Sequence, residues 1–61
     1  MKLKKKEQHI FLKLAEELSE LSTEVLKAVN KPHKMNIVEI QDEIIDVLER
    51  IDDVKEVLDN G

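Results

Sequence analysis

Four carboxylates, arranged in two pairs, are the residues of this 61-residue sequence that could do chemistry together. Glu17 and Glu20 form one pair, Glu43 and Asp46 form the other, and both pairs have the spacing i, i+3. Side chains three positions apart lie on the same side of an α-helix, one turn from each other. Carboxylate oxygens are ligands that a hard divalent cation such as Mg²⁺ prefers, and substrate phosphates commonly complete its coordination. If the two pairs meet in the fold, they predict a Mg²⁺ site for phosphate chemistry.

The elements that must position these carboxylates are predicted by apolar residues that recur at steps of three and four. This spacing is typical of amphipathic α-helices, and it covers residues from about 7 to 30 and from about 37 to 59. The predicted apolar stripes are Ile10, Leu14, Leu18, Leu21, Val25 and Val29 in the first helix, and Ile40, Ile44, Val47, Ile51, Val54 and Leu58 in the second. At about 100° per residue, both carboxylate pairs fall beside the stripe of their helix, on the same side of it.

The sequence also predicts where the two helices begin and end. Pro32 disfavours the helical conformation at the residue before it, so the first helix should end near residue 30. Asn36 is a good N-cap for the second helix, with Glu39 three positions later. The connection 31–36 is short, which favours an antiparallel hairpin and brings the carboxylate pairs to similar heights. Residues 1–6 read as a basic, frayed arm, and Asn60-Gly61 as a C-terminal stop.

The composition predicts an all-α protein that assembles with copies of itself. Charged residues make up 39% of the chain, hydrophobic residues 41%, and there is one Gly and one Pro. A chain this short buries little surface, and the absence of cysteine excludes disulfides and thiolate zinc sites. Several apolar residues lie off the main stripes, namely Leu12, Ala15, Leu26, Val38 and Ile45. We therefore expect a homo-oligomer, a dimer or tetramer, in which the hairpin forms a four-helix bundle or a larger assembly.

Charge and hydropathy argue against two classes of partner. The net charge of −4 argues against nucleic acid, although Lys2 and residues 4–6 form a basic arm that could contact phosphates. Charges interrupt every apolar run well short of the roughly 20 residues that cross a bilayer. We expect no membrane partner and a cytoplasmic location.

The four carboxylates also have an ordinary structural interpretation. With 14 acidic residues in the chain, several i, i+3 pairs arise by chance on solvated helix faces. Lys13 with Glu17, and Asp46 with Arg50, have the i, i+4 spacing of simple ion pairs. Periodicity alone leaves the metal site and the solvated face open as alternatives.

Two segments resemble motifs of a known superfamily. The stretch from Glu16 to Leu21 (EELSEL), followed by the stretch from Glu43 to Leu48 (EIIDVL), is similar to the paired E-x-x-E and E-x-x-D motifs of the MazG-like all-α nucleoside triphosphate pyrophosphohydrolases. The resemblance covers roughly Leu14 to Leu58. It implies Mg²⁺-dependent hydrolysis of an NTP or dNTP to a monophosphate and pyrophosphate, in which Glu17, Glu20, Glu43 and Asp46 are the metal ligands and catalytic carboxylates.

The sequence also departs from that superfamily. Its members generally have additional helices around the nucleotide, whereas this chain has only the pair that carries the motifs. Arg50 is the candidate phosphate contact, with Lys13 and Lys34 behind it, and Phe11, the one aromatic residue, reads as core. The alternative function is therefore a non-catalytic helical oligomerisation or interaction module that binds a nucleotide or a protein partner.

Overall fold

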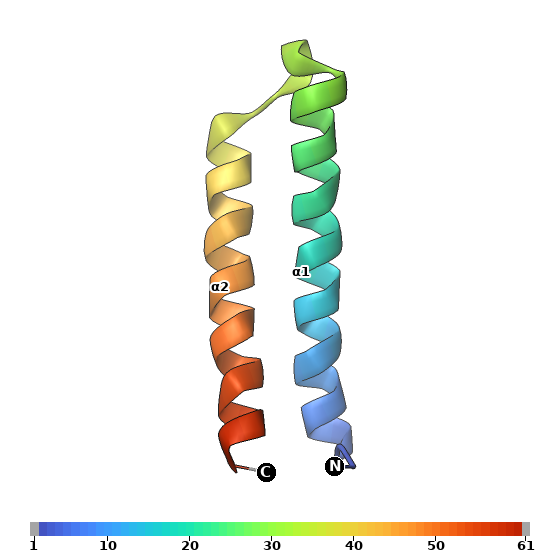
Figure 1. The fold of residues 1–61 in the computed structure, drawn as a ribbon, viewed down its shortest axis with the longest axis vertical. Coiled ribbons are helices and arrows are strands. Elements are labelled where there is room, and N and C mark those ends of the chain that lie inside the picture. Colours follow the sequence, from blue (N-terminus) through green and yellow to red (C-terminus); the bar gives the residue numbers. More distant parts are fainter. Residues whose placement is uncertain (1, 61) are drawn as a thin grey trace.

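The computed structural model describes residues 2–60, which form two long helices packed as an antiparallel hairpin (Figure 1). Helix α1 spans Lys5–Asn30, a 3₁₀ turn η1 spans Pro32–Lys34, and helix α2 spans Ile37–Asn60. The described residues contain no strand, and the start of α1 and the end of α2 lie at the same end of the hairpin. The all-α helical hairpin expected from the sequence is confirmed.

The start of α1 lies within the basic arm. Helix α1 begins at Lys5 rather than at residue 7, because the backbone N–H of Lys4 donates to Glu7 Oε1 at 2.8 Å. This bond is half of a capping box, in which an acidic side chain in the first turn reaches back to the residue before the helix. Gln8 adds a second bond from its Nε2 to the carbonyl of Leu3 at 3.1 Å.

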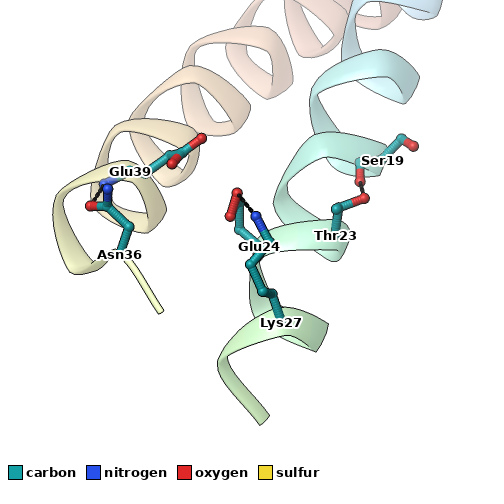
Figure 2. A network of polar contacts seen from close by, with 6 residues as sticks. All are labelled: Ser19, Thr23, Glu24, Lys27, Asn36 and Glu39. Atoms are coloured by element: carbon teal, nitrogen blue, oxygen red, sulfur yellow. Dashed lines mark hydrogen bonds and ion pairs between the residues drawn. The ribbon is translucent and has the colours of Figure 1, made fainter. Parts of the chain in front are cut away.

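The connection follows the chemistry of Pro32 and Asn36. Lys31, directly before the proline, leaves the helical region at φ −138° and ψ 67°, so α1 ends at Asn30. Its N–H still donates to the carbonyl of Lys27 at 2.8 Å. The N–H of Glu39 donates to Asn36 Oδ1 at 3.0 Å, as Figure 2 shows, which confirms the predicted N-cap. Helix α2 continues to Asn60, and Gly61 lies outside the described residues.

The two helices meet along a seam that contains fewer apolar residues than the stripes predict. Seam residues are buried or half-buried and alternate at steps of three and four, as in an antiparallel coiled coil. They are Ile10, Leu14, Glu17, Leu21, Glu24 and Ala28 in α1, and Ile40, Glu43, Val47, Arg50, Val54 and Val57 in α2. Val47, Val54 and Val57 are the only buried apolar residues in the described chain, and none of them is completely shielded from solvent. The prediction that Glu17 and Glu43 lie beside the apolar stripe is therefore wrong, since both lie in the seam.

The remainder of the predicted stripes faces outward. We define the apolar face as the positions that recur every seven residues on one side of the seam: Phe11, Leu18 and Val25 in α1, and Ile37, Ile44, Ile51 and Leu58 in α2. All except Phe11 and Ile51, which are half-buried, are exposed in the hairpin. The stripes of the sequence were too wide for one partner helix, so their residues divide between the seam and this face. Across residues 2–60, neither helix combines the length and apolar character that a bilayer crossing requires.

Candidate metal centre

Three of the four predicted carboxylates converge at the middle of the hairpin. Glu17 comes from α1, and Glu43 and Asp46 come from α2, with one oxygen of each lying within 4.8 Å of the others. Glu17 and Glu43 approach because both occupy seam positions. Asp46 follows Glu43 by three residues, so it projects from the same side of α2 one turn further on. Glu17 of the first pair thus meets both members of the second pair in space.

Two of the converging oxygens are buried without a protein partner. Among the described residues, Glu17 Oε2 and Glu43 Oε2 are shielded from solvent and accept no hydrogen bond. A buried acceptor without a hydrogen bond costs free energy, and the cost is larger for a charged group. Such oxygens are suited to a cation or to a proton.

The electrostatic environment of both glutamates favours the protonated form. Burial raises the pKa of Glu17, and Glu20, through a hydrogen bond and its charge, and then Asp46 raise it further, while Arg50 opposes the shift. Burial likewise raises the pKa of Glu43, and the charges of Glu20, Glu17 and Asp46 add to it. Like charges that share a site disfavour ionisation unless something positive is present. A cation bound among these carboxylates would offset the repulsion that raises the two pKa values.

Glu20 lies next to this cluster but not in it. It is exposed on the flank of α1, and its influence on the pKa of both Glu17 and Glu43 shows that it is close to them. Glu20 also lines a groove of about 330 Å³ between the helices, together with Thr23, Glu24, Glu39 and Glu43. Because Glu20 and Glu39 line the same groove, the sides of α1 and α2 that carry these residues lie on one face of the hairpin.

Glu24 is a site residue that was not predicted from the sequence. It is only 8% exposed and is the one buried charged residue among those described. Its Oε1 accepts a hydrogen bond from Lys27 Nζ at 3.0 Å, and Figure 2 shows this pair on α1. The seam spacing that includes Glu17 continues through Leu21 to Glu24, and this spacing is the signal that could have identified it.

The basic residues near the cluster pair differently from the i, i+4 prediction. Lys13 Nζ lies 3.9 Å from Glu16 Oε2, so Lys13 pairs with Glu16 and not with Glu17. Arg50 Nη1 lies 3.6 Å from Asp53, and its Nε is buried without a partner in the described chain. Both pairs are i, i+3, and neither Glu17 nor Asp46 forms an ion pair with another residue of the 2–60 range. Arg50 is in the seam and lowers the pKa of Glu17, so it faces the cluster. Lys34 is exposed in η1, at the tip of the hairpin.

Comparisons with protein-family models, with curated proteins and with solved structures give no match to this chain.

Proposed function

We propose that this chain is a reduced, MazG-like nucleoside triphosphate pyrophosphohydrolase that acts with Mg²⁺ as a cytoplasmic homo-oligomer. The observation that supports the proposal is the convergence of Glu17, Glu43 and Asp46 from two helices, with two buried oxygens that have no protein partner. The motifs around these residues resemble those of the superfamily, and the resemblance supplies the reaction. Hydrolysis would yield a nucleoside monophosphate and pyrophosphate.

The donor set fits Mg²⁺. All three groups are carboxylates, which are hard oxygen ligands. Oxygens on opposite sides of Mg²⁺ lie about 4.2 Å apart, since each bond is about 2.1 Å long. One oxygen of each carboxylate lies within 4.8 Å of the other two, so small side-chain rotations would bring all three within bonding distance of a single ion. When bound, the ion would neutralise phosphate charge and organise an attacking water.

The chain's own residues have distinct roles in this proposal. Glu17, Glu43 and Asp46 would hold the ion, and Glu20, at the edge of the cluster, would orient the water and accept its proton. The water oxygen attacks the α-phosphorus, the bond from that phosphorus to the α–β bridging oxygen breaks, and pyrophosphate leaves. Arg50, whose Nε at the seam has no partner among the described residues, is the candidate donor for a phosphate oxygen. Lys13, held by Glu16, is a more distant second contact.

The direct test is product analysis with a panel of NTPs and dNTPs and Mg²⁺. Monophosphate and pyrophosphate should appear in equal amounts. Glu43→Gln should lower the rate by at least roughly 10–100-fold, which is the loss seen when a residue that only hydrogen-bonds to a metal ligand is changed. Glu49→Gln is the matched control, because Glu49 is an exposed acid on the same helix outside the cluster. Absence of product across the panel, or equal rates for the two variants, would refute catalysis at this site.

A second candidate function is a non-catalytic helical interaction module. The observation that favours it is the amount of apolar surface left exposed on both helices, including Leu18, Val25, Ile44 and Leu58. In this case the chain turns over no nucleotide, and its thermal melting temperature is unchanged by Mg²⁺ with nucleotide. A ligand that binds only the folded form must raise that temperature, so the melt separates the two functions.

A further inference from the structure

Many of the apolar residues that the seam leaves out lie on one face of the hairpin, whereas Leu12 and Ile45 lie on the backs of the helices. Glu20 of α1 and Glu39 of α2 line the same groove, which places their flanks together. Near the chain ends, Lys6 and Asp53, on those same flanks, line another groove between the helices. The opposite flanks of α1 and α2 must then share the other side of the hairpin. Those flanks carry the apolar face, whose residues recur every seven positions from Phe11 to Leu58.

The area and shape of the hairpin match half of a larger bundle. Its accessible surface is 4918 Å², whereas a compact monomer of its mass exposes about 4,100 Å². The difference, about 800 Å², equals the area that each partner buries in a standard protein interface. The radius of gyration is 14.0 Å, against about 10 Å for a compact domain of this length, and the dimensions are 44 × 15 × 13 Å. Two further helices packed on the apolar face would bring the accessible surface per chain and the radius of gyration closer to the values of a compact protein.

We propose that a second copy of this chain covers the apolar face, forming a two-fold symmetric dimer in which four helices surround an aliphatic core. The face carries no charged residue at its seven positions, so it can pack against itself without placing like charges together. Ala15, Ser22 and Leu48 lie on its outer edge and are small or apolar, which lets the partner helices approach. The partner copy supplies the core that Val47, Val54 and Val57 alone do not provide.

This dimer places the carboxylate clusters on the outside. Glu20 and Asp46 lie on the flanks opposite the apolar face, so the groove stays open to solvent in each copy. Each hairpin would hold a complete cluster, and the dimer would have two independent sites. The inference deepens the homo-oligomer part of the proposed function and does not depend on catalysis, because its tests use neither nucleotide nor metal.

The first test compares the solution mass of Leu18→Glu with that of Leu12→Glu. Leu18 is on the apolar face and 46% exposed in the hairpin, whereas Leu12 is on the back of α1 and 66% exposed. The wild type and Leu12→Glu should sediment at twice the chain mass of 7.1 kDa, and Leu18→Glu should be a monomer or unfolded. A monomeric wild type, or loss of the dimer in Leu12→Glu as well, would overturn the proposal.

The second test remains decisive if Leu18→Glu does not fold. The chain has no cysteine, so Ser22→Cys and Ser19→Cys each introduce a single thiol, at positions that are both exposed in the isolated hairpin. Position 22 borders the apolar face, and position 19 is on the back of α1. In the dimer, Ser22→Cys should react with a maleimide at least about tenfold more slowly, since its thiol reacts only when the interface opens. Equal rates at the two positions would leave the face free for a different partner and refute the dimer.

Discussion

The substitution Ile44→Ala should weaken dimerisation by an amount that follows from the exposure of Ile44. Its side chain is 43% exposed in the hairpin, and full burial of an isoleucine contributes about 1.5–3 kcal/mol. In the dimer, the partner copy buries the exposed part of Ile44, which contributes about 1 kcal/mol to association. Because the dimer is symmetric, the substitution removes this contribution from both copies. A loss of about 2 kcal/mol raises the dimer dissociation constant roughly 30-fold.

Sedimentation equilibrium over a dilution series measures this constant directly, and Ile45→Ala is the matched control. Ile45 is 54% exposed in the hairpin, more than Ile44, but it points to the back of α2 rather than to the apolar face. We expect its dissociation constant to stay within about threefold of the wild-type value, as for surface substitutions away from packed contacts. If Ile45→Ala weakens the dimer as much as Ile44→Ala does, exposure alone governs association and the assignment of the face is wrong.

Three further predictions concern the cluster and the hairpin. Because burial raises the pKa of Glu17 and of Glu43 above 4.5, the folded state binds protons more tightly than the unfolded state, so metal-free stability should fall as pH rises from 4.5 through the raised pKa values. Glu17→Gln should flatten this dependence in thermal melts from pH 4 to 8, and a wild-type curve that rises over the range would contradict the shift. Mg²⁺ should raise the melting temperature of the wild type and of Glu49→Gln but not of Asp46→Asn, and an equal rise in all three would mean non-specific binding. Asn36→Ala should lower the stability of the hairpin by about 1 kcal/mol, or roughly 4–8 °C, whereas Asn36→Asp should retain it.

The hairpin was predictable because its boundaries depend on local chemistry. Pro32 restricts the residue before it, and Asn36 bonds a neighbouring N–H, so neither needs a distant contact to act. The start of α1 was placed two residues late because the bond from the Lys4 N–H to Glu7 extends the helix into a lysine-rich segment. Lysine is itself a good helix former, and its abundance there was interpreted only as charge.

The division of the apolar residues could not be predicted from one helix at a time. Leu14 and Leu18 belong to the same stripe on a single wheel, yet Leu14 lies in the seam and Leu18 on the apolar face. Which of them meets α2 depends on how the second helix is rotated, and that rotation is set by both helices together. The same rotation moved Glu17 and Glu43 into the seam and buried Glu24. The convergence of the carboxylates was predicted, but its cause was a seam position rather than a flank.

The polar seam and the apolar face follow from one another. Glu17, Glu24, Glu43 and Arg50 occupy positions that apolar residues fill in an ordinary coiled coil, so the hairpin gains little stability from its own seam. A chain that keeps unpartnered carboxylate oxygens between its helices must obtain its core elsewhere, and the apolar face offers a surface for it because most of its residues are exposed in the hairpin. Association through that surface would supply the missing stability without displacing the carboxylates. The charged seam is therefore consistent with a binding site that the fold tolerates because a second hairpin stabilises it from the other side.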